Sequence, residues 1–271
     1  MRQSKLISRK HKEKPADATL ASHIYLLRGG YMRPVANGIY SLLPPGKRVQ
    51  QKIEAIIREE MNKVDGQEVM MPVVMPRELW DESGRWDSVG PELLRFKDRT
   101  GHDMLLGMTH EEAVTALART EATSYRDYPF MLYQIQTKFR DEARPRAGLI
   151  RVREFTMKDA YSFDMDAAGL DVSFEKMRQA YCNIFDRLSL KYRMVEADSG
   201  AIGGNNSNEF MVLASSGEDT IIYCENCDYG ANLEKSVCTA EVTAPAADML
   251  PMEKIPTPGI KTVKDLSDML G

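Results

Sequence analysis

Five arginines crowd into residues 140–153, and they are the strongest chemical signal in the sequence. They are Arg140, Arg144, Arg146, Arg151 and Arg153. A guanidinium group offers planar paired donors that match phosphate oxygens, so the cluster suits a phosphorylated ligand. The alternative is a solvated basic hairpin, paired with Asp141, Glu142 and Glu154, because runs of charge usually form solvated surface.

Two strands joined by a turn are expected to position this cluster. The first strand closes at residues 139–142, and Pro145 and Gly148 mark a turn. Residues 149–155 then alternate apolar and charged side chains, which predicts the second strand. Further side chains follow at alternate positions and should share one face: Met157, Asp159 and Tyr161.

Residues 109–112 (Thr-His-Glu-Glu) form a second candidate site. Thr109 followed three residues later by Glu112 predicts a capping box that opens a helix over 111–120. His110 alone is not expected to be catalytic.

Two other motifs favour structure over chemistry. The glycines of residues 198–210 match neither a dinucleotide-binding nor a P-loop spacing, so a phosphate loop is not favoured there. Cys224, Cys227 and Cys238 resemble part of a zinc ribbon, but a structural zinc needs four ligands and all four histidines precede residue 111. Reduced, unligated thiols are therefore expected.

Composition narrows the class of protein. A net charge of −4 argues against general coating of nucleic acid, so any RNA contact must come from local patches. One such patch opens the chain, where residues 1–14 hold six Lys or Arg and one acid. No apolar run resembles a secretory signal or could span a bilayer, so we expect a cytoplasmic enzyme with no membrane association.

The remaining periodicity predicts a mixed chain of helices and strands. Helices are expected at 16–30, 47–63, 171–190 and 260–270, and a helical turn anchored by both tryptophans at 78–90. Strands are expected at 68–74, 93–98, 103–108, 191–197, 210–214 and 220–224. Residues 32–43 should be irregular and extended, with a turn at Asn37-Gly38. The core face of the helix at 171–190 is expected to comprise Phe174, Met177, Tyr181, Phe185 and Leu188.

The order of these residues resembles a known family. Arg140-x-Glu142 followed by Arg151-x-x-x-Phe155-x-x-x-Asp159 resembles motif 2 of the class II aminoacyl-tRNA synthetases. The longer string QTKFRDEARPR…REFTMKDAYSF resembles the bacterial prolyl-tRNA synthetase family in particular. The helix at 47–63 and the following strand with Pro72 resemble motif 1, which implies a homodimer with Pro72 at its interface.

The resemblance implies an α+β fold, with a mostly antiparallel sheet of about six strands flanked by helices. It implies an ATP-dependent ligase that activates proline to prolyl-adenylate, with Mg²⁺ bridging the phosphates, and transfers proline to tRNA(Pro). Arg140 would bridge the proline carboxylate and the α-phosphate, Glu142 would receive the adenine amino group, Arg151 would hold the γ-phosphate and Phe155 would stack on adenine. The proline site would comprise Arg140, Thr109, Glu111, Met157, Asp159, Tyr161, Gly203 and Gly204. Arg144 and Arg146 would meet the tRNA acceptor end.

The chain also departs from the family pattern. Asn208 stands where the family commonly has histidine, and no arginine follows Arg193, so the ATP-gripping arginine of motif 3 is missing. We expect a catalytic core at 1–238, a Pro/Ala-rich linker at 239–259 and the first helix of a truncated insertion domain at 260–271. Activity of this chain alone is therefore expected to be weak or absent. The alternative is a non-catalytic synthetase-like module that dimerises and binds a ligand or RNA.

Overall fold

The computed structural model describes residues 2–16, 18–198, 207–214, 216–237, 254–260 and 262–270. It divides into two compact units, Met1–Ser236 and Val237–Gly271. The second unit contains helix α7 (Val263–Leu270), so a helix is present where the sequence predicted one. Its assignment to an insertion domain stays a prediction.

The N-terminal elements form a helix and a hairpin. A short 3₁₀ turn η1 (Gln3–Lys5) precedes α1 (Ala21–Arg28). Strands β1 (Met32–Ala36) and β2 (Ile39–Leu42) pair antiparallel, so the region expected to be irregular is a hairpin, whose register shifts between Pro34 and Ala36. Its turn contains Gly38 at φ +75°, a conformation that glycine adopts without strain.

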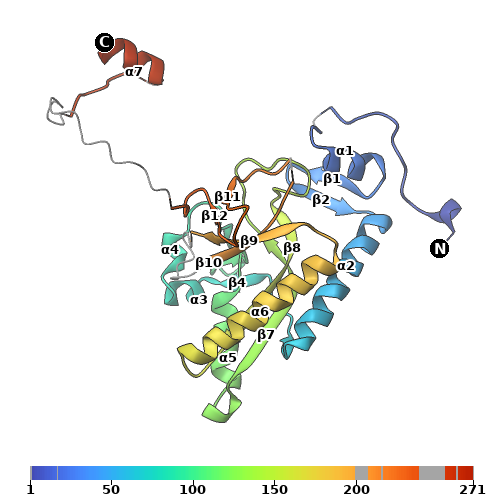
Figure 1. Ribbon diagram of the computed structural model, residues 1–271, viewed down its shortest axis with the longest axis vertical. Helices are drawn as coiled ribbons and strands as arrows, with labels where there is room; N and C mark the ends of the chain where they lie inside the picture. Colours follow the sequence, from blue (N-terminus) through green and yellow to red (C-terminus); the bar gives the residue numbers. More distant parts are fainter. Residues whose placement is uncertain are drawn as a thin grey trace. The chain divides into compact units, whose positions relative to one another are not determined.

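The long helix α2 (Pro44–Lys63) begins three residues earlier than predicted, because proline is well tolerated in a first helical turn. It lies beside α6 (Ala167–Arg187) in Figure 1. Glu60 joins the two helices: its buried carboxylate lies 2.7 Å from Lys63 and from Arg187 and 3.1 Å from Asn183. The hydrogen bond from Lys63 is the main reason that the pKa of Glu60 is lowered.

The predicted core face of α6 is only partly correct. Its buried residues are Ala180 and Ile184, and Phe174 is 47% exposed. Tyr181 and Phe185 instead stack against a ring from a neighbouring strand, Phe210, with centroids 5.3 and 5.6 Å away. Of the other predicted residues, Met177 packs against the buried cluster of Met61, Met131 and Tyr133, so the predicted face lies only partly against the core.

Two three-stranded sheets lie at the centre of the first unit. One has the order β3-β7-β8 and consists of β3 (Gly66–Glu68), β7 (Phe130–Phe139) and β8 (Glu154–Phe163). The other has the order β4-β6-β5 and consists of β4 (Val74–Pro76), β6 (Asp103–Leu106) and β5 (Arg95–Lys97). Strands β7 and β8 pair antiparallel along their full length.

The single strand predicted at 68–74 is wrong, because β3 and β4 belong to different sheets. Pro72 has no N–H to donate to a ladder, and the chain between the two strands is held by side chains instead. Gln134 accepts a hydrogen bond from the Met71 N–H (3.1 Å), and Gln136 donates to the Met71 carbonyl (2.9 Å).

The strand predicted at 149–155 is also wrong, since β8 begins at Glu154. Residues 140–153 form a long loop, here called the β7–β8 loop, with one isolated bridge between Arg146 and Arg151. This loop packs on the N-terminal hairpin. The Arg153 N–H donates to the Gly38 carbonyl (2.8 Å), and a Cβ built on Gly38 would lie 2.7 Å from Pro145.

The two tryptophans lie on short helices and are buried, in agreement with the helical turn predicted at 78–90. Helices α3 (Arg77–Glu82) and α4 (Arg85–Ser88) place Trp80 and Trp86 in a buried cluster with Met75, Leu93, Leu105 and Ala113. Helix α5 (Glu111–Glu121) packs beside them, and η2 (Tyr125–Asp127) leads into β7.

A four-stranded sheet of order β10-β9-β12-β11 completes the unit. It contains β9 (Tyr192–Ala197), β10 (Ser207–Val212), β11 (Ile221–Tyr223) and β12 (Gly230–Asn232). The α+β class with mostly antiparallel pairing is therefore confirmed, but the described strands are divided among four sheets, not gathered in one. Within the described ranges, no helix is long and apolar enough to cross a bilayer.

Candidate active site

Asp159, on β8, is the centre of a buried polar network. Tyr161 donates its hydroxyl to Asp159 Oδ2 (2.5 Å), and Gln134, directly opposite on β7, donates to the same oxygen (2.9 Å). Lys138 Nζ lies 2.9 and 3.0 Å from the two carboxylate oxygens. Two of the predicted proline-site residues, Asp159 and Tyr161, are thus in direct contact.

Lys138 and His110 extend this network into the core. Lys138 is fully buried, and its ammonium lies 2.6 Å from His110 Nδ1, while His110 Nε2 lies 2.9 Å from the Pro72 carbonyl. Burial is the main cause that lowers the pKa of both Lys138 and His110, and Lys138 lowers that of His110 further. His110 is therefore held as a neutral imidazole that donates to Pro72 and accepts from Lys138.

Tyr161 is held as a neutral phenol. Burial is the largest cause that raises its pKa, and the hydrogen bond to Asp159 raises it further. Deprotonation would place a second anion beside the Asp159 carboxylate in a poorly solvated site. Tyr161 is consequently a fixed hydrogen-bond donor in this site.

Thr109 and Glu111 contact each other directly at the start of α5. The Thr109 hydroxyl donates to Glu111 Oε2 (2.5 Å), and Arg85 donates to Glu111 (3.2 Å) and to Glu112 (3.0 Å). The predicted capping box is wrong: the N-cap is His110, with no side-chain cap, and Glu112 accepts hydrogen bonds from Ser83 and Arg85. The Glu112 carboxylate is therefore bound by side chains from other elements and does not cap the helix.

Glu111 also borders open space. A cavity of about 480 Å³ is lined by Glu111 together with Ser83, Arg85 and Thr115. Arg85 is held there by the ring of Trp80, whose centroid lies 4.9 Å from the guanidinium carbon. The Glu111 carboxylate is therefore oriented by Thr109 and Arg85 and remains accessible to a ligand.

Arg140 and Phe155 lie together farther along the β7–β8 pair, at the end that joins the β7–β8 loop. The Arg140 guanidinium carbon is 5.5 Å from the Phe155 ring centroid, and its Nε lies 3.4 Å from the Met108 carbonyl. Met157 follows two residues after Phe155 on β8, opposite Gln136. No carboxylate neutralises Arg140 among the described residues, so its charge is available to an anion.

The other arginines of the β7–β8 loop are mostly neutralised. Arg151 pairs with Glu142 (2.8 Å), Arg146 with Glu218 (2.7 Å), and Arg153 with Asp141 (3.4 Å). Arg151 is the largest cause of the lowered pKa of Glu142. The pairings expected of Asp141 and Glu142 are confirmed, whereas Glu154 makes no ion pair in the described part of the chain. Arg144 is exposed, and its backbone N–H donates to Glu142 (3.0 Å).

The remaining predicted residues belong to the C-terminal part of the first unit and to the segments around it. Gly203, Gly204 and Cys238 lie outside the described residues. Asn208 lies on β10 opposite Glu196, and Cys224 and Cys227 are free thiols. The described ranges contain no group of three or more His, Cys, Asp or Glu that could hold a metal ion.

Residues that the sequence analysis missed surround the predicted ones. Lys138 and Gln134 complete the Asp159 network, Arg85 orients Glu111, and Glu218 holds Arg146. A signal for the first two exists in the sequence, because Gln134, Gln136 and Lys138 alternate along a strand that begins with four apolar or aromatic residues. Arg85 and Glu218 are distant in sequence from their partners and leave no such signal.

Comparison with known proteins identifies the class of protein that this fold and site define. The family model described as the class II tRNA synthetase core domain (G, H, P, S and T) matches residues 94–242, so the chain belongs to this family. The match includes both β7 and β8 and the loop between them.

Its similar relatives are proline–tRNA ligases. The chain is 54% identical over 271 residues to that of Syntrophomonas wolfei subsp. wolfei, covering 100% of this chain and 48% of the relative. It is 53% identical over 270 residues to that of Moorella thermoacetica, covering 100% and 47%. The chain thus spans about half the length of the curated relatives it matches.

Solved structures support the fold. The Giardia lamblia prolyl-tRNA synthetase in complex with prolyl-adenylate gives a TM-score of 0.57 at 23% identity, covering 61% of this chain and 35% of that one. The Cryptosporidium parvum prolyl-tRNA synthetase complexed with L-proline and AMP gives 0.61 at 16% identity, covering 68% and 38%. At these identities the likeness concerns the fold alone.

Proposed function

We propose that this chain carries the amino-acid activation site of a cytoplasmic proline–tRNA ligase. The ligase would join proline to ATP as prolyl-adenylate and then transfer the prolyl group to tRNA(Pro). The relatives at about 54% identity support this proposal. So does the clustering of Thr109, Glu111, Asp159 and Tyr161, because Thr109 contacts Glu111 and also lies within hydrogen-bonding range of Tyr161, which donates to Asp159.

The first reaction needs no protein nucleophile. An oxygen of the proline carboxylate attacks the α-phosphorus of ATP, and the bond to the bridging oxygen breaks, so that pyrophosphate leaves with its electron pair. Catalysis then consists of positioning the reactants and neutralising charge on the phosphorus. Arg140, whose guanidinium has no carboxylate partner in the described part of the chain, would bridge the proline carboxylate and the α-phosphate.

The proline nitrogen would be held by acceptors. A secondary ammonium has two N–H donors, and the Glu111 carboxylate and the Thr109 oxygen can accept both. The Thr109–Glu111 hydrogen bond and Arg85 orient that carboxylate before the ligand arrives. Met157, Asp159 and Tyr161 would line the ring pocket, with Lys138 fixing Asp159, and Gly203 and Gly204 would lie against the ring.

ATP would bind on the side of Arg140 and Phe155. Phe155 would stack on adenine, Glu142 would accept from its amino group, and Arg151 would hold the γ-phosphate. Because Arg151 is paired with Glu142 at 2.8 Å, ATP would exchange this internal ion pair for contacts with the nucleotide. Mg²⁺ would enter as the counter-ion of the substrate phosphates.

The second reaction requires an RNA partner. Arg144 and Arg146 would contact the acceptor end of tRNA(Pro) from the β7–β8 loop, and Arg144 is already exposed. The enzyme would act as a homodimer with the Pro72 segment at its interface.

The observation that carries the proposal is the oriented Glu111 carboxylate beside the Asp159–Tyr161 network. It is tested by titrating the 271-residue chain with a non-hydrolysable prolyl-adenylate analogue in a calorimeter, and with the seryl and threonyl analogues. We expect the parent chain to bind the prolyl analogue and Arg140→Ala to lose this binding. Glu111→Gln should bind the analogue at least tenfold more weakly, because a charge-assisted hydrogen bond contributes about 1.5–3 kcal/mol. Proline-dependent ATP–pyrophosphate exchange that disappears in Arg140→Ala would show the chemistry itself.

Two outcomes contradict the proposal. Equal affinity for the three analogues would refute proline as the substrate, since the family also includes enzymes for glycine, histidine, serine and threonine. Binding of RNA without binding of any adenylate analogue would favour the non-catalytic synthetase-like module.

A further inference from the structure

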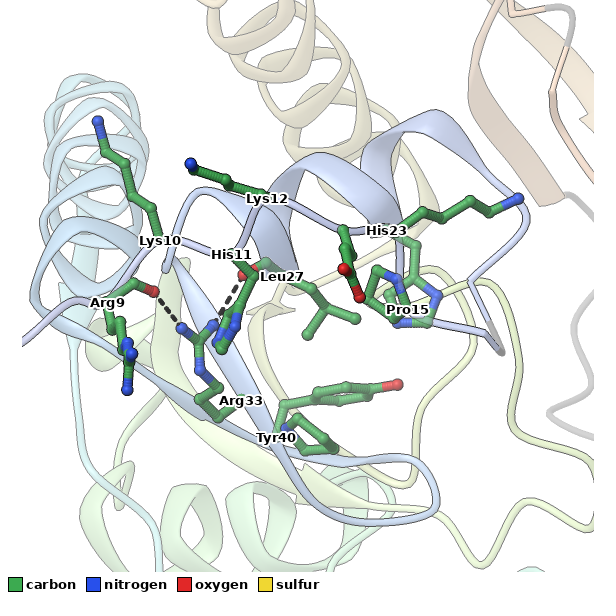
Figure 2. Close-up of a pocket in the computed structure, with 12 residues that line it drawn as sticks. Arg9, Lys10, His11, Lys12, Pro15, His23, Leu27, Arg33 and Tyr40 are labelled. Carbon is green, nitrogen blue, oxygen red and sulfur yellow. Dashed lines mark hydrogen bonds between the residues drawn. The ribbon is translucent and has the colours of Figure 1, made fainter.

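The N-terminal residues form a second pocket, which the proposed function does not use. A cavity of about 670 Å³ lies between residues 9–15, α1 and the β1–β2 hairpin (Figure 2). We call residues 9–15 the N-terminal arm. The cavity is within the size range of ordinary ligand pockets.

The arm is held in place by specific hydrogen bonds. The Arg33 guanidinium donates to the carbonyls of Arg9 and Leu27, drawn as dashed lines in Figure 2. The His11 N–H donates to the Arg28 carbonyl (3.0 Å), and the Ser8 hydroxyl donates to the Gly30 carbonyl (2.8 Å). The pocket is thus a built feature of the fold.

Its outer rim is strongly basic. The charged residues lining it are Arg9, Lys10, Lys12, Lys14 and Arg33 against Glu13. Lys10, Lys12 and Lys14 are exposed, and none of them makes an ion pair in the described part of the chain. Figure 2 shows Lys10 and Lys12 extending outward from the arm. With Lys14 they occupy alternate positions of residues 9–15, so their charges are spread along the arm. Spread charges suit a linear polyanion better than one isolated phosphate.

Two rings, those of His23 and Tyr40, line the interior of the pocket. His23 is only 6% exposed, lines the cavity and has neither ring nitrogen hydrogen-bonded to a described residue. Its ring meets that of Tyr40 edge to face, with centroids 6.1 Å apart. Flat rings beneath a basic rim are the combination that binds unpaired bases and their phosphates.

The pocket adjoins the β7–β8 loop. A Cβ built on Gly148 would lie 2.9 Å from His23 Cγ, so the loop backbone packs directly on the histidine ring. The same loop carries Arg144 and Arg146, the residues assigned above to the acceptor end of tRNA.

We propose that this pocket binds single-stranded RNA, with the arm lysines on the phosphates and an unpaired base against His23 and Tyr40. The inference rests on the proposed function, because a ligase that charges tRNA must hold the unpaired acceptor end near the β7–β8 loop. The arm then extends the RNA contact beyond the two loop arginines.

The test measures binding of a short labelled RNA ending in the CCA sequence of tRNA, by fluorescence anisotropy at several salt concentrations. The variant replaces Lys10, Lys12 and Lys14 with alanine in the full chain. The matched control replaces three other exposed lysines without ion pairs among the described residues: Lys176, Lys191 and Lys235. Each phosphate contact on a single strand contributes about 0.7 to the salt slope, so we expect the arm variant to lower the slope by about 2. Affinity at low salt should fall at least about tenfold, while the control binds like the parent chain.

Adenylate-analogue binding is measured on the same proteins and should be unchanged in the arm variant. If the arm variant loses RNA binding but still binds the adenylate analogue, the result supports RNA binding by the arm. This outcome is distinguishable from a failure of the proposed ligase function. An equal loss of RNA affinity in the arm variant and the control would show that only net charge matters, and would overturn the inference. Unchanged RNA binding in the arm variant, or full displacement of the RNA by AMP at equal concentration, would overturn it as well.

Discussion

Replacing Asp159 with asparagine should destabilise the fold in a way that depends on pH. Asp159 is the only carboxylate within ion-pair distance of Lys138 among the described residues, and Lys138 has no exposed surface. Removing one partner of a buried ion pair costs about 3–5 kcal/mol, because the other charge is left without compensation. This loss is comparable with the whole stability of many domains, which is about 5–15 kcal/mol.

The loss of stability in Asp159→Asn has an upper limit, since the unpaired Lys138 can release its proton and become neutral. Holding a lysine of ordinary pKa 10.5 neutral costs about 1.4 kcal/mol per pH unit below that value, or about 5 kcal/mol at pH 7 and about 2 kcal/mol at pH 9. The pKa of Lys138 is lowered by burial, so between that lowered pKa and 10.5 the unfolded chain binds more protons than the folded one, and stability rises with pH in that window. The loss in Asp159→Asn should therefore shrink from at least about 3 kcal/mol at pH 7 to less than about 2 kcal/mol at pH 9.

Urea unfolding followed by the fluorescence of the buried tryptophans measures this loss. The double variant Lys138→Met/Asp159→Asn should be more stable than Asp159→Asn alone, because it also removes the uncompensated charge. Asp81→Asn is the matched control, since Asp81 forms an exposed pair with Arg77 whose contribution is about 0–1 kcal/mol. A loss below about 1 kcal/mol at pH 7 in Asp159→Asn, or a loss that does not change by pH 9, would refute the reasoning.

Two further predictions concern the β7–β8 loop and Glu111. Gly38→Ala should lower the free energy of unfolding by about 1–3 kcal/mol more than Gly101→Ala. Both glycines have positive φ, but only a Cβ at Gly38 would meet a proline ring of the loop, at 2.7 Å. Equal losses in the two variants, measured by thermal unfolding, would contradict this prediction. Arg85→Ala should weaken binding of the prolyl-adenylate analogue about tenfold by releasing the Glu111 carboxylate. Arg119→Ala, which breaks an exposed pair, should leave the calorimetric affinity unchanged, and an unchanged affinity in Arg85→Ala would refute its orienting role.

The local sequence pattern was sufficient to predict one long helix and the face of one strand. The apolar period of α2 and the alternation of Met157, Asp159 and Tyr161 on β8 depend only on the geometry of a helix and a strand. Both predictions agree with the structure. The two tryptophans are buried on short helices as expected, because large aromatic rings dominate the burial of a small layer.

Predictions failed where two distant segments compete for the same group. The capping box at Thr109 satisfies every local rule, yet Glu112 pairs with Ser83 and Arg85 of other elements. The strand expected at 149–155 has the right alternation, but the β7–β8 loop packs on the N-terminal hairpin instead of pairing. Tertiary contacts override a local preference that contributes only about 1 kcal/mol.

The sequence by itself determined the α+β class, the order of the main elements and the family, because residue order and side-chain period are properties of the chain. Only the tertiary structure decided which charges are buried and which are free. Lys138 and Arg140 are two residues apart on the same stretch, yet one is sealed against Asp159 and the other is left without a carboxylate partner among the described residues. The environment of a charge is set by the segments that pack around it, and those segments come from distant parts of the chain.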